Sequence, residues 1–432
     1  MPTSPQNLFA EKRAFRRYLL RWYASHKRDL PWRKKQDPYW ILVSEFMLQQ
    51  TRVETVLPYF ERFLKTFPTL EVLAKASLQS VLKVWAGLGY YARARNLHAA
   101  VKTIRHDHGG KIPSTKEDLL PLPGFGPYTA GAVASLAFNE RAAALDGNVK
   151  RFLGRLLDSG GKASTGSRKN FLERAVEELI PSGQASDFNQ AMMDLGAMIC
   201  IPVRPRCKEC PVKRFCRWRA TDPGTLFQPS PPVGEGSPCG VSSSTPQGEG
   251  GGDSRRSSIG RIEGERKNQK KKKIRKEVWA VAVVEQGGRF LLHRKEGRGL
   301  LAGLWQFPTV VLSGKGISTE AEAGEMNAER KGAYRERETL KRALKEKFGL
   351  RIKINGSLPL KGHQFTHLHV TMKPFLCSLV NTFACDRPAK GVRWIKPSSL
   401  SRYPISRAMG KIAALIPRDS ARRPGPGNNH VH

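Results

Sequence analysis

Apolar residues in the first half of the chain recur every three or four positions, in segments that end at Gly, Asn or Pro. This spacing is typical of amphipathic helices. It predicts a helix over residues 8–26 and two more within 39–67, which meet near Pro58 because proline interrupts a helix. Strand patterns are nearly absent up to residue 220. The sequence therefore predicts an all-α domain over 1–220.

The pattern changes twice beyond residue 220. Residues 221–276 are rich in Pro, Gly and Ser and then in Lys, and a segment with so little to bury is predicted to be a disordered basic linker. Short apolar runs around a Gly-Gly pair then predict paired strands, and residues 335–349 predict a helix that ends at glycine. We expect a multidomain protein with a small α+β domain over 277–415 and a disordered tail over 416–432.

The chain carries 74 Lys and Arg residues against 37 Asp and Glu residues, a formal net charge of +37. Such an excess favours a polyanionic partner, with nucleic acid as the first candidate, over a merely solvated basic surface. No apolar leader pattern and no long apolar run is present, so we expect neither a secretory signal nor a membrane contact. We expect a monomer of the reducing cytoplasm, associated with the nucleoid if the source is bacterial.

Four of the seven cysteines are spaced C-x6-C-x2-C-x5-C. Disulfides, a metal site and buried thiols are the alternatives, and a reducing compartment favours the metal site. The single C-x2-C and the short loop favour an iron–sulfur cluster, with zinc as the alternative metal. The candidate ligands are Cys200, Cys207, Cys210 and Cys216. We interpret the other three cysteines, Cys239, Cys377 and Cys385, as structural or incidental.

The segment LPLPGFGPYTAGAVAS, which begins at Leu120, contains a Pro-Gly-x-Gly turn directly before a predicted helix. Gly124 and Gly126 let the backbone approach a ligand closely, and the free N–H groups at the helix start favour an anion. A helix-hairpin-helix of this kind grips a DNA phosphate without reading bases. We expect DNA contacts from Leu122, Gly124 and Gly126.

Two carboxylates are candidates for chemistry. Glu45 interrupts a helix that is apolar on most sides, and a buried carboxyl has a raised pKa. The alternative is a glutamate that faces solvent or pairs with Arg33 or Arg52. Asp146, in LDGNVKR, lies at the start of a predicted helix, where it is either an ordinary N-cap or a carboxylate that points into a cleft.

These features together resemble a known family of enzymes. The hairpin LPGFGPYTAG, the LDGNVKR aspartate and the cysteine loop resemble the endonuclease III superfamily of DNA glycosylases. Within it, SEFMLQQTRVETVLPYFERF, WAGLGYYARARNLH and FNQAMMDLGAMIC resemble the MutY-type adenine DNA glycosylases. The resemblance implies an all-α catalytic half with a [4Fe-4S] cluster on the four cysteines. It also implies double-stranded DNA as partner, with adenine mispaired opposite 8-oxoguanine or guanine.

The resemblance implies a specific chemistry for the two carboxylates. In this family the adenine is flipped out of the duplex and its glycosidic bond is hydrolysed in base-excision repair. Glu45 is then the acid that protonates adenine N7, and Asp146 is the carboxylate that stabilises the oxocarbenium-like sugar.

Further roles follow from the same resemblance. The positions expected around the flipped base are Trp32, Arg33, Tyr128 and Gln190. Some relatives carry Glu in place of Gln190, which makes its adenine contact less secure. Gln50 and Tyr90 match residues that wedge into the duplex. For Trp32 and Tyr90, the residues alone favour core packing.

Tyr128 bears on whether the enzyme cuts the DNA strand. Strand-cutting relatives carry a lysine at this position, and its amine forms a Schiff base with the sugar. Tyrosine has no such amine. The sequence therefore predicts a monofunctional glycosylase that leaves an abasic site.

The second domain resembles the MutT-like, or Nudix-like, domain at the C-terminus of this family. Ala343 and Lys347 replace two glutamates that hold Mg²⁺ in Nudix hydrolases, and Ala328 and Tyr334 occupy two further motif positions, so we expect no nucleotide hydrolysis. The segment HQFTHLH resembles the family's loop for 8-oxoguanine, and a metal site on its histidines is the alternative. The residues expected to recognise 8-oxoguanine are Phe365, Thr366 and His367.

Three rival functions are disfavoured by particular residues. A strand-cutting endonuclease III is disfavoured by Tyr128, and a catalytically inactive DNA-binding protein is disfavoured by the presence of Glu45 and Asp146. A Nudix nucleotide hydrolase is disfavoured by Ala343 and Lys347.

Overall fold

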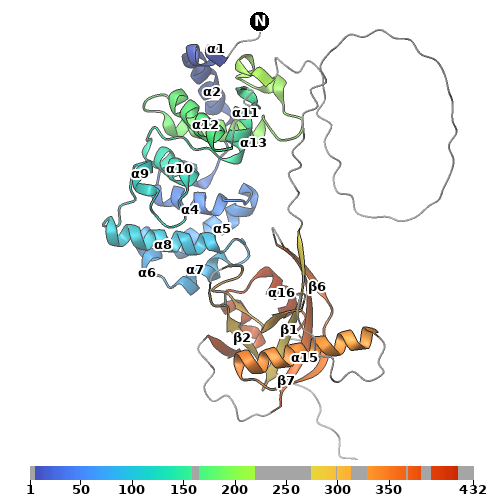
Figure 1. The fold of residues 1–432 in the computed structure, drawn as a ribbon. Helices are drawn as coiled ribbons and strands as arrows, with labels where there is room; N and C mark the ends of the chain where they lie inside the picture. Colours follow the sequence, from blue (N-terminus) through green and yellow to red (C-terminus); the bar gives the residue numbers. More distant parts are fainter. Residues whose placement is uncertain are drawn as a thin grey trace, which may run out of the picture.

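The structure, a computed structural model, describes residues 5–157, 165–218, 274–297, 299–312, 328–365, 368–380 and 391–416. Figure 1 shows a helical body, coloured blue to green, above a second body that contains a sheet, coloured yellow to red. Most of the expected linker and nearly all of the expected tail lie outside the described residues. Where the structure resumes, β1 already begins at Arg275, and Ile416 is buried, so the second body extends slightly beyond its expected boundaries of 277 and 415 at both ends.

The helical body contains no strand among its described residues, as the sequence predicts. Its helices are α1 (Pro5–Ala10), α2 (Lys12–His26), α3 (Pro31–Lys34), α4 (Pro38–Leu48), α5 (Val53–Thr66), α6 (Leu70–Lys75), α7 (Leu78–Trp85), α8 (Ala92–Asp107), α9 (Lys116–Leu119), α10 (Pro127–Phe138), α11 (Gly147–Leu156), α12 (Thr165–Leu179) and α13 (Ala185–Met198). Two short 3-10 turns follow, η1 (Cys207–Glu209) and η2 (Lys213–Phe215). No helix in the described part of the chain is long and apolar enough to cross a membrane.

The break between α4 and α5 is not at Pro58, so that prediction was wrong. Pro58 lies inside α5, and the chain breaks at residues 49–52 instead. A proline inside a helix removes one hydrogen bond and crowds the preceding turn. The α5 helix persists because its apolar face, with Val56, Phe60 and Phe63, is fully buried.

The α10 helix lies between the two apolar cores of the helical body. Ala130 and Val133 pack in the core formed with α4 to α8, whereas Ala132 and Leu136 pack in the core formed with α2, α11, α12 and α13. Between the two cores, α10 lies against the backbone of Ala143 and Ala144. The approach is so close that a Cβ on Gly131 would lie 2.2 Å from the Ala143 carbonyl oxygen. This position admits only glycine, and the close approach fixes where the start of α10 lies.

The second body is built on one mixed sheet with the path β3-β2-β1-β7-β5, and β4, β6 and β8 pair with β1, β7 and β2. Its elements are β1 (Arg275–Gln286), β2 (Arg289–Arg294), β3 (Trp305–Gln306), β4 (Thr309–Val311), α15 (Ala328–Phe348), β5 (Ile352–Ser357), β6 (Lys361–Phe365), β7 (Leu368–Leu379), β8 (Val392–Ile395), η4 (Pro397–Arg402) and α16 (Arg407–Ala413). The Gly-Gly pair turns β1 into β2 with positive φ at both glycines, and α15 ends at Gly349, also at positive φ, as the sequence predicts.

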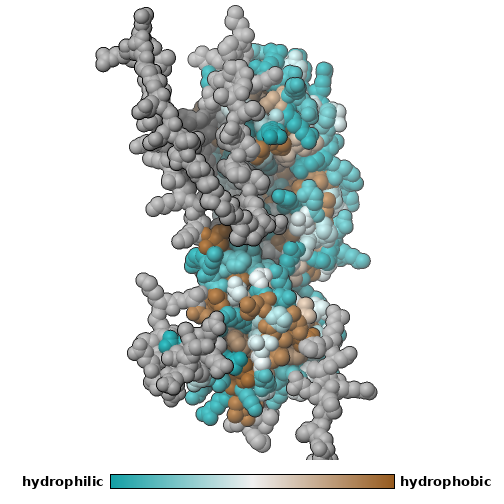
Figure 2. Space-filling model, turned by 90° about the vertical axis from the view of Figure 1, so that its right-hand side faces the viewer, coloured by the Kyte–Doolittle hydropathy of each residue, from teal (hydrophilic) through white to brown (hydrophobic). Residues whose placement is uncertain are grey.

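The alternation of β1 decides what covers each face of the sheet. Ala280 and Val284 pack with Leu340 and Leu344 of α15 on one face. The residues between them, such as Val281, pack on the other face in a core that is continuous with the core of the helical body. That core also contains Ala408, Met409 and Ile412 of α16, so α15 covers one face of the sheet, and α16 and the helical body share a core with the other. The face shown in Figure 2 is mostly hydrophilic over the helical body and more apolar over the second one.

Candidate functional site

Glu45 lies on α4 with its side chain turned into the protein, and the residue is 3% exposed. The hydroxyl of Tyr128, at the start of α10, donates a hydrogen bond of 2.7 Å to Glu45 Oε2. Burial raises the pKa of Glu45 to about 7, although the Tyr128 hydrogen bond opposes the shift. The buried alternative therefore describes this glutamate, and its carboxyl holds a proton near neutral pH.

Asp146 caps the first turn of α11. Its Oδ1 accepts a hydrogen bond from the Val149 backbone N–H at 2.6 Å, and its Oδ2 accepts one from Asn148 Nδ2 at 2.9 Å. The helix start favours negative charge at this point. The sequence left two alternatives for Asp146, an ordinary N-cap or a carboxylate that points into a cleft. Both describe it, because this N-cap residue also lines the cavity described next.

One cavity of about 1080 Å³ brings most of the predicted residues together. Its lining includes the predicted residues Trp32, Arg33, Glu45, Gln50, Gly124, Gly126, Tyr128, Asp146 and Gln190. These come from α3, α4, α10, α11 and α13 and from the turns between them, so the cavity is assembled from segments distant in sequence. Tyr90 and Leu122 are not part of its lining.

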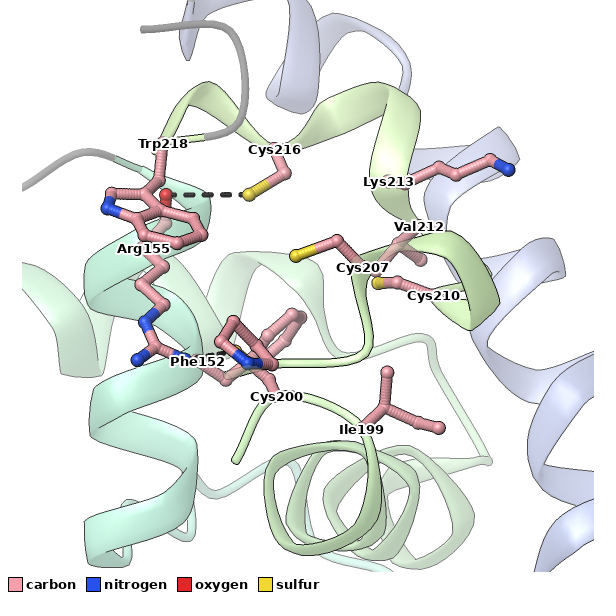
Figure 3. Close-up of a pocket in the computed structure, with 11 residues that line it drawn as sticks. Phe152, Arg155, Ile199, Cys200, Cys207, Cys210, Val212, Lys213, Cys216 and Trp218 are labelled. Carbon is pink, nitrogen blue, oxygen red and sulfur yellow. Dashed lines mark hydrogen bonds between the residues drawn. The ribbon is translucent and has the colours of Figure 1, made fainter. Parts of the chain in front are cut away.

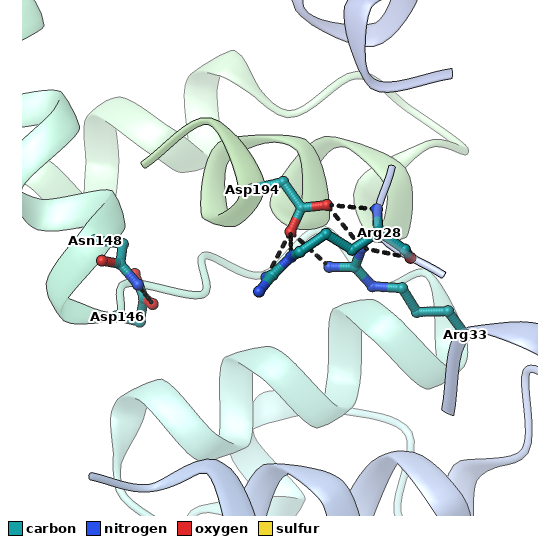
Figure 4. Close-up of polar contacts among 5 residues, drawn as sticks. All are labelled: Arg28, Arg33, Asp146, Asn148 and Asp194. Atoms are coloured by element: carbon teal, nitrogen blue, oxygen red, sulfur yellow. Dashed lines mark hydrogen bonds and ion pairs between the residues drawn. The ribbon is translucent and has the colours of Figure 1, made fainter. Parts of the chain in front are cut away.

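Arg33 is held by an acid that the sequence did not single out. Asp194 on α13 is fully buried and accepts two hydrogen bonds from Arg33, at 2.7 and 2.9 Å, and one of 2.7 Å from Arg28 Nε (Figure 4). Burial alone raises the pKa of Asp194, but the two guanidinium groups outweigh burial and hold it below its usual value. The only sequence signal was an acidic residue within the apolar stretch MMDLGAM.

Trp32 and Gln190 line the same cavity as Arg33. Trp32 is buried and packs edge-to-face on Phe60, with ring centroids 5.0 Å apart, while still lining the cavity. Gln190 donates a hydrogen bond of 3.1 Å to the hydroxyl of Ser186. Core packing and a place at the cavity are therefore compatible for Trp32.

The two residues predicted to wedge into DNA both have left-handed backbone conformations, with φ of 58° at Gln50 and 47° at Tyr90. The buried side chain of Arg93 holds both loops. It donates to the carbonyl oxygens of Gln49, at 2.6 Å, and Gly89, at 3.2 Å, and its guanidinium lies 5.3 Å from the ring of Tyr90. Burial lowers the pKa of Arg93 to about 10, so it stays charged.

Arg93 also ends α4, because it donates to the carbonyl oxygens of Phe46 and Met47 at the end of that helix. Sequence reasoning missed this residue. The available signal was its spacing, since Arg93 stands one helical turn before the buried Leu97 on the apolar stripe of α8.

The predicted hairpin leads into α10 as expected. Gly124 has a φ of 80°, and a Cβ there would lie 2.5 Å from Cβ of Asn96, so only glycine fits. Gly126 is the N-cap of α10. The Leu122 side chain is 4% exposed and packs in the core, so a DNA contact at this residue would come from its backbone.

The four clustered cysteines line one pocket beside Phe152 and Ile199 (Figure 3). Burial, reinforced by the neighbouring thiols, raises the pKa of the Cys210 thiol to about 12. Arg155 Nη1 lies 3.4 Å from the sulfur of Cys200. A set of four soft sulfur donors that face one pocket suits a thiophilic metal cluster.

Among the described residues, which include the four cysteines, no group of three or more His, Cys, Asp or Glu side chains is placed to hold a metal ion. This applies to His363 and His369, whereas His367 and Thr366 lie outside the described part of the chain. Cys377 is buried in the sheet core, and Cys239 and Cys385 are not described.

Phe365 ends β6 at the turn toward β7. It is partly buried, with its ring centroid 6.0 Å from Trp279 and 4.5 Å from His363. The parallel pairing of β1 and β7 places Arg275 beside Leu368, so the start of β1 lies next to this turn. In Figure 1 this end of the sheet is directed toward the helical body.

Comparison with known proteins gives matches in both bodies. The model of the HhH-GPD superfamily of base excision DNA repair proteins matches residues 43–180, and the NUDIX domain model matches 279–415. The chain is 34% identical to an adenine DNA glycosylase of Rattus norvegicus, over 95% of this chain and 80% of that protein. It is 35% identical to an adenine DNA glycosylase of Homo sapiens, over 93% and 74% of the two chains.

Among solved structures, a thermostable thymine-DNA glycosylase is similar, with 30% identity and a TM-score of 0.46, over 49% of this chain and 98% of that chain.

Replacing Asp194 by Asn should destabilise the protein by about 3 kcal/mol, because two partly buried guanidinium groups lose their counter-charge. The folded-state pKa of Asp194 is depressed, so its contribution is present above the unfolded value of about 4 and is lost as pH falls through the lower folded value. Asp194→Asn should remove that contribution to the decrease in the free energy of unfolding at acid pH. Denaturant unfolding over a pH series measures both effects.

The matched control is Asp187→Asn, which changes an exposed aspartate in the first turn of the same helix. It should cost less than about 1 kcal/mol. Equal losses for the two variants would mean that the Asp194 ion pairs do not hold α3 against α13.

Proposed function

Because the chain belongs to the family of adenine DNA glycosylases, which are hydrolases of base-excision repair, we propose that it removes adenine paired with 8-oxoguanine or guanine and leaves an abasic site. The observation that carries the proposal is the pair of carboxylates in one cavity. Glu45 is buried with a pKa of about 7, and Asp146 lies at the start of a helix.

Glu45 is the proposed general acid. A carboxyl whose pKa lies near 7 is protonated in a large fraction of the protein molecules at neutral pH, and it still gives up its proton readily. It delivers that proton to N7 of a flipped adenine, which turns the base into a better leaving group. Tyr128 fixes the orientation of the Glu45 carboxyl through its hydrogen bond to Oε2.

Asp146 is the proposed stabiliser of the positive charge that develops on the sugar. The hydrogen bonds from Val149 and Asn148 hold the carboxylate in place, and neither donor carries a charge that would cancel it. One carboxyl that donates a proton and a second carboxylate that stabilises the sugar is the division of labour used in glycoside hydrolysis.

The adenine pocket is proposed to lie between Trp32, Arg33 and Gln190, which line the same cavity as the carboxylates. The Asp194 carboxylate and the Arg28 backbone carbonyl accept hydrogen bonds from the Arg33 guanidinium, which fixes the orientation of that group at the cavity. Gln50 and Tyr90 are proposed to enter the duplex on loops held by Arg93, and the hairpin at Gly124 and Gly126, with the Leu122 backbone, is proposed to bind a phosphate.

The four cysteines are proposed to hold a [4Fe-4S] cluster, which suits their sulfur donors and their common pocket. When bound, the cluster would supply a covalent cross-link of the loop, which carries several Arg and Lys side chains. Arg151 links this loop to the site, because it donates to the Cys200 carbonyl oxygen and to Asn148 Oδ1, each at 2.9 Å.

The second domain, proposed to span 277–415, is proposed as the reader of the base opposite adenine. Support comes from the loss of the Nudix metal ligands at Ala343 and Lys347 and from Phe365 at the sheet end directed toward the helical body. Thr366 and His367 complete the proposed reading loop. A sheet without metal ligands but with an aromatic residue at a turn is suited to stacking on a base.

The rate of adenine excision should fall as pH rises above about 7, because Glu45 is then ionised and has no proton to give. Tyr128→Phe removes a hydrogen bond that favours the ionised form of Glu45, so the alkaline limb of the kcat/KM profile should move up by about one pH unit.

Glu45→Gln should lose about 10²–10⁴-fold or more in excision rate while still binding DNA.

Tyr39→Phe is the control for this profile, because its hydroxyl, on the same helix as Glu45, bonds the Phe67 carbonyl and not the carboxyl. Its profile should match the wild type. Excision by Glu45→Gln at a near wild-type rate would remove Glu45 from the acid role.

Borohydride should trap no covalent adduct between the wild-type protein and a duplex with adenine opposite guanine, because Tyr128 has no amine. Tyr128→Lys should yield a trapped adduct, since burial lowers the pKa of a lysine in this position and frees its amine. Gel electrophoresis after reduction separates adduct, abasic site and strand break. Tyr128→Phe is the control without an amine, and a trapped adduct with wild type would contradict the monofunctional proposal.

Phe365→Ala combined with His367→Ala should lower the preference for 8-oxoguanine over guanine by an amount on the order of 1–3 kcal/mol. A chain that ends near residue 220 should still excise adenine opposite guanine slowly but lose most of the preference. Single-turnover rates with the two duplexes give the ratio.

Leu360→Ala is the control for the double variant, because this exposed residue directly precedes the same strand. It should leave the ratio unchanged. A shortened chain that discriminates as well as the full one would assign the reading to the helical body.

A further inference from the structure

The two bodies meet along α7 and the start of α8, where the segment between β2 and β3 packs against them. Gln79 on α7 makes two hydrogen bonds across this contact. Its Nε2 donates to the Gly303 carbonyl oxygen at 3.0 Å, and its Oε1 accepts from the Trp305 indole N–H at 3.0 Å. Arg95 on α8 donates to the Ala302 carbonyl oxygen at 2.8 Å. We refer to Gln79 and its two partners as the clamp.

The segment from the second body is shaped for this contact. Leu301 and Gly303 have left-handed backbones, with φ of 64° and 81°. A Cβ on Gly303 would lie 3.1 Å from Cδ1 of Leu82, so the backbone touches α7 directly. Positive φ at a leucine is rare and persists only where surrounding contacts hold it.

The contact combines an apolar core with a half-buried polar clamp. Leu82 and Trp85 of α7 belong to the same buried cluster as Leu304 and Trp305 of the second body. Gln79 uses both its amide donor and its amide acceptor across the contact. The clamp therefore fixes the register between the two bodies, which apolar packing alone leaves adjustable.

The same contact reaches the loop that carries Tyr90. The indole N–H of Trp85 donates to the Gly89 carbonyl oxygen at 3.1 Å, and the Gly87 N–H donates to the Tyr91 hydroxyl at 3.2 Å. A Cβ built on Gly87 would lie 3.8 Å from Nε of Arg407, on α16 of the second body. Residues 86–91 thus lie between the Arg93 contacts on one side and the second body on the other.

We propose that the clamp docks the second domain on α7 and α8 before DNA is bound, and that this docking positions the Tyr90 loop, so that Gln79 is a positioning residue for discrimination between opposing bases. The proposal deepens the proposed function, because its effect on discrimination rests on the second domain being the reader. Docking itself does not depend on that assignment.

The test compares Gln79→Leu, which removes both hydrogen bonds, with Gln79→Glu, which keeps the acceptor for Trp305 and loses the donor to Gly303. Gln286→Leu makes the same chemical change at the end of β1, where the side chain has no hydrogen-bond partner among the described residues. All variants are made in the full chain, and thermal unfolding verifies that each is folded.

Hydrogen exchange of the DNA-free protein measures docking. Gln79→Leu should speed exchange at residues 86–91 and 299–305 by about tenfold, with exchange elsewhere unchanged and Gln79→Glu intermediate. A general loss of stability would speed exchange throughout, and that outcome, or no change in either segment, would overturn the proposal.

Single-turnover excision measures the functional consequence. Gln79→Leu should lower the rate opposite 8-oxoguanine about tenfold and the rate opposite guanine much less, whereas Gln286→Leu should change neither. Fluorescence of 2-aminopurine placed beside the mispair should show weaker unstacking in Gln79→Leu, because the Tyr90 loop is less well held.

The two proposals fail in different ways. If the chain that ends near residue 220 keeps its preference, the reader assignment fails, while the hydrogen exchange result still decides whether Gln79 docks the domains. If that shortened chain loses its preference but Gln79→Leu keeps it, the reader assignment stands and the clamp is overturned.

Discussion

The burial of the Glu45 carboxyl is the constraint on which the helical body depends. A carboxyl that must hold a proton near pH 7 needs a site from which water is excluded, and burial supplies the raised pKa. Glu45 is buried on α4 beside Tyr128 of α10, and residues of α3 and α13 line the cavity next to it. The close approach at Gly131 brings α10 near enough for Tyr128 to reach the carboxyl, and the Asp194 ion pairs bring α3 against α13.

Two largely buried arginines also hold the site together. Arg93 and Arg33 are both placed where a charged group is costly, and in each case several acceptors offset that cost. The planar guanidinium bonds acceptors in two directions at once, so one side chain joins segments that are distant in sequence. Arg93 joins the end of α4 to the loop before α8, and Arg33 joins α3 to α13.

Local sequence information predicted what is local. The glycine turn before α10, the N-cap at Asp146 and the cysteine loop all depend on neighbours within one or two turns, and they appear where the pattern placed them. Helix bounds were predicted less well, because the helix expected over residues 8–26 is divided into α1 and α2, and α15 begins at Ala328 rather than at residue 335. The break after α4 was missed because the residue that ends that helix, Arg93, lies on α8. Asp194 and Gln79 escaped notice for the same reason, since their partners are remote in sequence. No spacing rule connects Tyr128 with Glu45 either, and only the family resemblance brought them together before the fold did.

The contact between the two bodies has a thermodynamic consequence for how the protein meets DNA. Its apolar surface is already out of water in the free protein, so it contributes nothing to the heat capacity change of association. The chain also carries a net charge of +37. Encounter with the duplex is then driven largely by the release of counterions from phosphates, and it varies steeply with salt.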